Sequence, residues 1–234
     1  MINIGTTEFY IAVPSLPRGE FETYSTLLFD DWENHVKGVL QLPDYSLSLT
    51  VDDGSVRAVA KIATAAGVLY VGIAQYGSFI TGLQTLESQA RTVGNYFGQR
   101  AGAPFESSNV QPKIRKRGES LTRLRNLFAK VQQRKITVEE AMFESQAIFG
   151  PEIETTPGFM IGLKESFEQT PLFLQQIQLP LDSVESEILL PDTKKQTKPR
   201  PTKPKSPAPA PDLYRVEVWR ESKKGKRNVQ VISL

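Results

Sequence analysis

The chain has 234 residues, of which 39% are hydrophobic and 9% aromatic, and this is enough for a packed core. It has one histidine and no cysteine, which excludes disulfides, thiolate metal sites and a cysteine nucleophile. The net charge of +2 is a cancellation, because residues 113–135 carry nine bases and one acid, whereas residues 136–192 carry one base and eleven acids. Such blocks can pair within one chain, which weakens a functional argument from either block alone.

The N-terminal part shows the patterns of strands and one helix. Residues 9–13 are a short apolar run, which predicts a first strand. Between residues 20 and 40, apolar side chains recur at spacings of three and four, which predicts an amphipathic helix. Residues 45–51 alternate between apolar and polar, and Asp53-Gly54 then predicts a hairpin with a returning strand at residues 56–61.

Residues 62–86 form an uninterrupted run without charged side chains, and they contain a helical stripe. Apolar residues at alternating steps of three and four predict one continuous helix that extends to residue 97. Small side chains on a second face would let another helix approach closely. The stripe consists of Ile62, Ala66, Leu69, Ile73, Tyr76, Ile80 and Leu83, and the small-residue face consists of Ala74, Ser78 and Gly82.

Two interpretations of this helix stay open. A helix of this length would span about 37 Å, enough to cross a bilayer core of roughly 30 Å. The four glycines of the segment are tolerated in membrane helices and in tightly packed helices. The polar residues Gln75, Ser78 and Gln84 oppose a typical membrane span. The alternative is a helix buried in a soluble domain, or packed against a copy of itself as a coiled coil.

Residues 113–135 form the basic segment, whose second half has an amphipathic helical pattern over residues 120–134. Cations around an apolar stripe suit contact with nucleic-acid phosphates or with an anionic membrane surface. No nucleic-acid-binding fingerprint accompanies them, and pairing with the acidic residues 136–192 is an equal alternative. The candidate anion contacts are Lys113, Arg115, Lys116, Arg117, Arg123, Arg125, Lys130 and Arg134.

Two further helices are predicted after the basic segment. Thr137 and Glu140 form a capping-box pattern that opens a helix ending near Phe149. Thr156-Pro157 predicts the start of another. Seven prolines between residues 191 and 211, mixed with lysines, then predict a disordered, extended linker.

The C-terminal residues predict a β-hairpin, because residues 213–220 and 228–233 both alternate around a Lys/Gly turn. An isolated hairpin is marginal in water, so its apolar side chains need another surface. That surface is either the chain's own body or a partner protein reached across the linker. The candidate contact residues are Tyr214, Val216, Val218 and Trp219.

The sequence predicts no catalytic site, no metal and no cofactor. A Ser-His-Asp or related site would have to use His35, the lone histidine. Asp31 precedes it by one helical turn, but no second motif completes a metal or nucleophile site. The phosphate-binding fingerprints GxxxxGK[ST] and GxGxxG do not occur. We therefore expect the chain not to be an enzyme.

The expected fold class is α+β and predominantly helical. Residues 1–103 are predicted to form an N-terminal strand and hairpin unit with the long central helix. Residues 113–190 are predicted to form a helical segment, followed by the linker at 191–212 and the β-hairpin at 213–234.

Three hypotheses for function remain. The first is a non-enzymatic interaction or accessory protein that uses the central helix and the hairpin to contact an unknown protein partner or a second copy. The second is a membrane-associated or membrane-inserting protein, through residues 62–86. The third is a nucleic-acid-associated protein, through residues 113–135. Residues 1–14 lack a secretory signal, so the expected location is cytoplasmic, with membrane association as the alternative.

Overall fold

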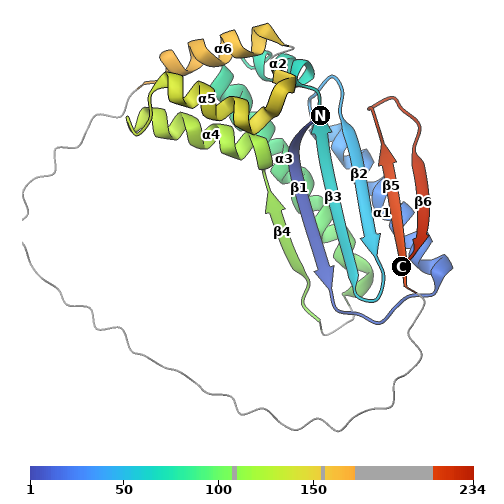
Figure 1. Ribbon diagram of the computed structural model, residues 1–234. Coiled ribbons are helices and arrows are strands. Elements are labelled where there is room, and N and C mark those ends of the chain that lie inside the picture. The colour runs from blue at the N-terminus through green and yellow to red at the C-terminus, as the bar shows by residue number, and fades with distance from the viewer. Residues whose placement is uncertain (107–109, 154–155, 172–212) are drawn as a thin grey trace, which may run out of the picture. The chain divides into compact units, whose positions relative to one another are not determined.

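The computed structural model describes residues 1–106, 110–153, 156–171 and 213–234. Its central feature is an antiparallel sheet in the order β4-β1-β3-β2-β5-β6 (Figure 1). The strands are β1 (Ile2–Ile11), β2 (Ser46–Asp52), β3 (Val56–Thr64), β4 (Lys113–Arg117), β5 (Tyr214–Arg220) and β6 (Asn228–Ser233). The helices are α1 (Arg18–Val39), α2 (Ala66–Ala74), α3 (Phe79–Gly102), α4 (Glu119–Gln132), α5 (Val138–Phe149) and α6 (Pro157–Glu168), with short 3-10 turns at Ala103–Phe105 and Gly150–Ile153. The expected α+β class is confirmed.

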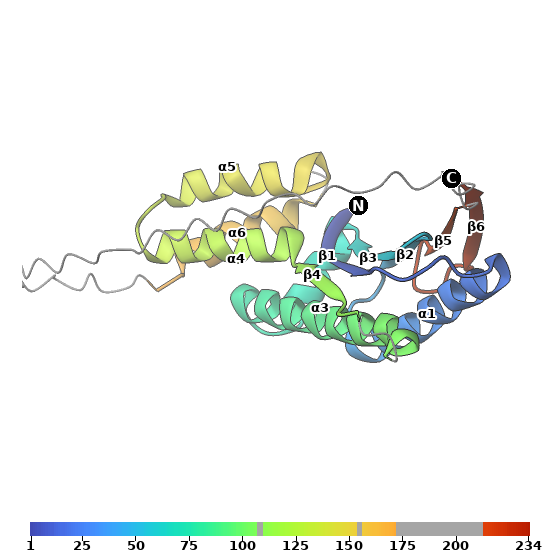
Figure 2. The same ribbon diagram turned by 90° about the horizontal axis from the view of Figure 1, so that it is seen from below.

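The first four strands follow a split β-α-β arrangement. Their order along the chain is β1-α1-β2-β3, then α2 and α3, then β4, and their order in the sheet is β4-β1-β3-β2. This is the ferredoxin-like topology, in which each crossover helix packs on the same face of the sheet. Figure 2 shows α1 and α3 together on that face, below the strands. The hairpin β5-β6 extends the sheet beyond β2.

The core lies between the sheet and these two helices. Strands β2 and β3 alternate in burial, so that every second side chain faces α1 and α3. Trp32 of α1 contacts Phe97 of α3 edge-to-face, with ring centroids 5.6 Å apart. The amphipathic pattern of residues 20–40 and the alternation of residues 45–51 therefore correspond to α1 and β2.

The prediction of one continuous helix over residues 62–97 is wrong. Ile62 belongs to β3, and the chain then forms α2 and α3 with a break between Ala74 and Phe79. Gly77 takes a φ of +81°, which ends α2 because it is a left-handed conformation that glycine adopts readily. Ser78 then caps α3 by accepting a hydrogen bond from the Thr81 backbone N–H at 3.2 Å.

Close packing of α2 on α3 also depends on Gly82. A Cβ atom at this position would lie 2.8 Å from the Ile73 Cα and closer still to the Ile73 carbonyl oxygen. Among the described helices, none combines the length and the apolar composition that a membrane crossing requires. The two helices α2 and α3 meet both criteria only when taken together, and they are bent by 109°.

Helices α4, α5 and α6 pack against one another and against α2 and the start of α3. The predicted capping box of α5 is confirmed, with Thr137 and Glu140 bonding each other's backbone N–H. Aromatic rings fill the contact, with Phe128 and Phe167 at 4.3 Å and Phe79 and Phe159 at 5.6 Å between centroids.

The C-terminal hairpin pairs with the chain's own sheet. Val216 and Val218 of β5 lie opposite Val51 and Leu49 of β2 and are fully buried. Two ion pairs join the hairpin to α1, namely Arg220 with Glu33 at 2.9 Å and Arg227 with Asp30 at 2.5 Å. The predicted linker at residues 191–212 lies outside the described residues.

Candidate nucleic-acid interface and adjoining cavity

The sheet face opposite α1 and α3 carries no helix over the middle of its strands in the described part of the chain (Figures 1 and 2). Because side chains alternate along a strand, this open face receives the residues whose neighbours fill the core. Tyr10 of β1 is therefore on the open face between the buried residues Phe9 and Ile11. Trp219 of β5 lies on the same face, next to the buried Val218.

Cations from β3 and β4, the two strands that flank β1, gather on the open face. The strand register places Arg117 and Lys61 on either side of Thr6, and Lys113 and Arg57 on either side of Tyr10. Arg115 faces Glu8 in the row between them. We call these five exposed cations the basic face: Arg57, Lys61, Lys113, Arg115 and Arg117.

Most of this charge is unpaired. Arg117 lies 3.6 Å from Glu8, and the other four cations make no ion pair within the described residues. Near the hairpin the cation is paired, because Arg215 bonds Asp52 at 2.6 Å. That hydrogen bond and the Asp52 charge raise the pKa of Arg215. The positive potential of the open face is thus concentrated over β4, β1 and β3.

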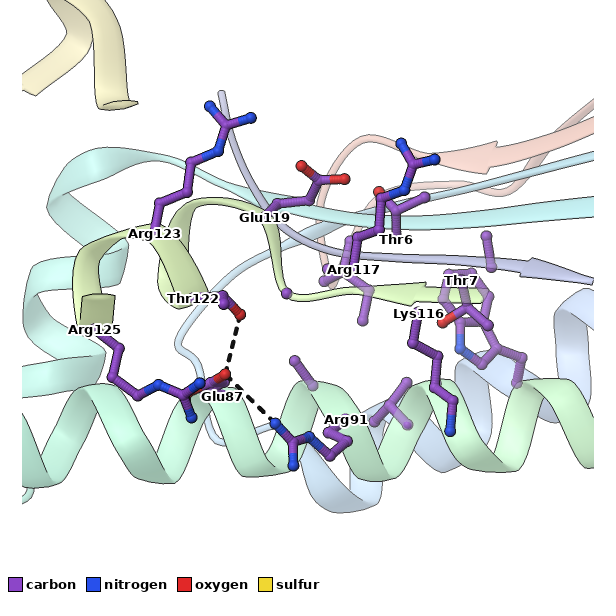
Figure 3. Close-up of a pocket in the computed structure, with 18 residues that line it drawn as sticks. Thr6, Thr7, Glu87, Arg91, Lys116, Arg117, Glu119, Thr122, Arg123 and Arg125 are labelled. Atoms are coloured by element: carbon purple, nitrogen blue, oxygen red, sulfur yellow. Dashed lines mark hydrogen bonds and ion pairs between the residues drawn. The ribbon is translucent and has the colours of Figure 1, made fainter. Parts of the chain in front are cut away.

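A cavity of about 430 Å³ adjoins the basic face where β4 runs into α4 (Figure 3). We call it the junction cavity. Its walls come from β1, β3, β4, α1, α3 and α4, with Gly118 in the turn between β4 and α4. Figure 3 shows Arg117, Glu119 and Arg123 directed away from α3, whereas Lys116 is directed toward it. The lining residues with charged or hydroxyl groups are Thr6, Thr7, Glu87, Arg91, Lys116, Arg117, Glu119, Thr122, Arg123 and Arg125.

One buried carboxylate organises the wall nearest α3. The Glu87 side chain is 6% exposed and pairs with Arg125 at 2.9 Å and with Arg91 at 3.6 Å. It also accepts a hydrogen bond from the Thr122 hydroxyl at 3.0 Å. The contacts with Arg125 and Thr122 join α3 to α4, and the two arginines neutralise the carboxylate where it faces the cavity.

The turn that closes the cavity has a strained start. Glu119 opens α4 with a φ of +41°, which is uncommon for a residue with a side chain. Within the described residues no side chain caps this helix, and whereas the Leu121 N–H bonds the Gly118 carbonyl, the Glu119 and Ser120 N–H groups keep their hydrogen-bonding capacity. Strained backbone of this kind is often found at functional sites.

The structure divides the predicted basic segment among four environments. Lys113, Arg115 and Arg117 belong to the basic face, because residues 113–117 form an edge strand and not the start of the predicted helical segment. Three others, Lys116, Arg123 and Arg125, line the junction cavity. Lys130 pairs with the acidic segment at Glu144, 3.0 Å away. Arg134 follows α4 with a φ of +55°.

The residues of the predicted helical stripe do not share one face. Five of them are buried in the chain's own core: Ile62, Ala66, Leu69, Ile73 and Leu83. Tyr76 and Ile80 pack partly against that core, whereas Ala74 and Ser78 are exposed around the break. In the hairpin, Val216 and Val218 are buried, and Tyr214 and Trp219 are half-buried.

His35 and Asp31 do not act on a common group. The His35 ring stacks on Tyr96 with centroids 3.9 Å apart, and the Asp31 carboxylate bonds Arg100 at 2.6 Å. Within the described residues, no cluster of three or more histidine, aspartate or glutamate side chains is placed to hold a metal ion.

Several residues of the site were missed from the sequence. The alternation of β3 carries Arg57 and Lys61 on one face, a signal that residues 56–61 already contained. Glu87 and Trp32 reach the cavity from separate helices, and no local pattern links them. Comparison of the chain with protein-family models, with curated proteins and with solved structures gives no match. A proposal for its function therefore depends on the geometry of this site.

Proposed function

We propose that the chain is a non-enzymatic nucleic-acid-binding protein that holds a single strand across the basic face. The observation that carries the proposal is the grouping of five exposed cations on β3 and β4, the two strands that flank β1, four of them without an ion pair in the described residues. Neutralising phosphates with Lys and Arg releases counterions, which drives binding without sequence preference.

The shape of the face favours a single strand over a duplex. A sheet surface presents side chains as a shallow platform, and unpaired bases can stack on its aromatic rings. Tyr10 offers such a ring, because it is 38% exposed and stands between Lys113 and Arg57 in the strand register. A ring flanked by cations suits a base flanked by phosphates.

The salt dependence of binding follows from the number of cations. Each phosphate contact with a single strand contributes a slope of about −0.7 to log K against log salt. Contact through all five cations would give a slope of about −3.5, and raising the salt from 50 to 200 mM would weaken binding about a hundredfold.

The test is the binding of a labelled random-sequence oligonucleotide, measured by fluorescence anisotropy at several salt concentrations. One variant replaces Lys113, Arg115 and Arg117 with alanine. A matched control replaces Lys130, Arg134 and Lys135 with alanine, which removes the same net charge from the C-terminal end of α4 and the turn after it.

We expect the β4 variant to bind more weakly, with a slope near −1.4, because two cations of the basic face remain. The α4 control should retain the wild-type slope. Equal slopes for the two variants would refute a specific role of the basic face, and no binding by the wild type at 50 mM salt would refute the proposal as a whole.

A further inference from the structure

We propose that the junction cavity binds the terminal phosphate of the strand on the basic face. This inference rests on the proposed function and names the chemical group that the cavity takes. Position supports it, since Arg117 belongs both to the basic face and to the lining of the cavity. A strand whose terminal phosphate contacts Arg117 has that phosphate beside the cavity.

The charge of the lining fits a phosphate monoester. Five cationic and two acidic side chains line the cavity, which leaves a net charge of +3. Arg125, Arg91 and Thr122 already hold Glu87, so that carboxylate is compensated. A terminal phosphate carries close to two negative charges at pH 7, whereas a phosphodiester carries one. The end of a strand is thus favoured over its interior.

The start of α4 adds a second source of positive potential. The helix has 14 residues, and no side chain in the described part of the protein caps its first backbone N–H groups. The N-terminus of such a helix favours an anion through these groups and through the helix dipole.

A buried donor inside the cavity wall points independently to a missing acceptor. Trp32 lines the cavity, is 1% exposed, and its indole N–H has no hydrogen-bond partner within the described residues. An unpaired buried donor is unfavourable, and buried polar groups are usually satisfied. The nitrogen itself is fully buried, so a phosphate or sugar oxygen in the cavity would satisfy it only after the wall around the indole shifts. The volume of about 430 Å³ is within the range of small-molecule sites.

The experiment compares three oligonucleotides of one sequence, with a 5′-phosphate, with a 3′-phosphate, and with hydroxyl groups at both ends. We expect one phosphorylated form to bind the full chain about ten- to hundredfold more tightly than the hydroxyl form, the effect of one or two charge-assisted hydrogen bonds. Lys116→Ala should lower this ratio to near one. The control Lys130→Ala, on the same basic segment but paired with Glu144, should keep it.

Tryptophan fluorescence gives a readout of the cavity itself. The chain has two tryptophans, and the Trp219→Phe variant leaves Trp32 as its reporter. Its emission should change with the preferred phosphorylated strand and not with the hydroxyl form.

The outcomes separate the two proposals. Equal affinity for all three strands would overturn the phosphate inference and leave the basic face intact. A response of Trp32 to inorganic phosphate alone, without preference among the strands, would also overturn it, because the cavity would then take free phosphate. Failure of every strand to bind would instead refute the proposed function.

Discussion

Replacing Gly82 with alanine tests the break between α2 and α3. The new Cβ would lie 2.8 Å from the Ile73 carbonyl carbon and Cα, whereas ordinary contacts begin at 3.4 Å. The neighbouring atoms are backbone and cannot rotate away, and the Ile73 carbonyl oxygen lies closer still, so α2 must move by clearly more than about 0.6 Å. Overpacking of this kind destabilises a protein by about 1–3 kcal/mol. We expect a net loss of about 2 kcal/mol, after a gain of about 0.5 kcal/mol from replacing a helical glycine.

Gly38→Ala is the matched control. Gly38 lies in α1, and a Cβ there would meet nothing within 4 Å. Only the gain of about 0.5 kcal/mol from replacing a helical glycine applies, so this variant should be slightly more stable than the wild type.

The assay is thermal unfolding followed by far-UV circular dichroism. For a chain of this size, 1 kcal/mol shifts Tm by about 2–4 °C. Gly82→Ala should lower Tm by about 4–8 °C, and Gly38→Ala should raise it by about 1–2 °C. In an uninterrupted helix both substitutions would be stabilising. A Gly82→Ala protein that melts at or above the wild-type temperature would therefore refute the bent arrangement.

Three further substitutions test other contacts. Thr137→Ala removes the capping box of α5 and should lower the free energy of unfolding by about 1 kcal/mol in urea titrations, whereas Thr137→Ser should retain most of it. Burial, with a contribution from Glu33, raises the pKa of Tyr45 to about 12 from 10.0. The folded-state pKa is the higher one, so stability is complete below pH 10 and falls by about 2 kcal/mol as the pH rises to about 12. Tyr45→Phe should flatten that pH profile without loss at pH 7, because the buried hydroxyl has no partner in the described residues; a large loss at pH 7 would contradict this. Arg227→Ala breaks an exposed ion pair with Asp30 and should change Tm by less than about 2 °C, and a larger change would show that the pair holds the hairpin in place.

Local sequence patterns were sufficient to predict the elements whose geometry is determined by residues close together in the sequence. The spacing of apolar residues predicted α1, and the alternation before Asp53-Gly54 predicted the β2-β3 hairpin. The cap of α5 follows from Thr137 and Glu140 alone. Each of these signals depends on a backbone geometry that a few residues determine.

The prediction of one continuous helix over residues 62–97 was wrong for a physical reason. Ala58, Ala60 and Ile62 alternate as a strand, yet their spacing merges with the apolar steps of the following helices. The signal for the break was present in Gly77 followed by Ser78, a left-handed turn and a helix cap. In an apolar segment a glycine is also typical of close helix–helix contacts. Composition alone therefore could not distinguish a break between two helices from a continuous, closely packed helix.

The candidate site was predicted only in part. Lys113, Arg115 and Arg117 were identified as anion contacts, but their common face depends on β4 pairing with β1. The position of Trp32 and Glu87 beside them depends on how α1 and α3 pack against the sheet. Such proximity has no signature in a single sequence.

The pairing of β5 with β2 affects how the protein is made. Arg215 reaches Asp52 across 163 positions of the chain, so the outer edge of β2 has no partner from this hairpin until the C-terminal residues leave the ribosome. At bacterial to eukaryotic elongation rates that delay is roughly 10–30 s. During this time an open sheet edge is a template for pairing with strands of other nascent chains. Ribosome-associated chaperones that shield such edges would therefore be expected to raise the yield of folded protein.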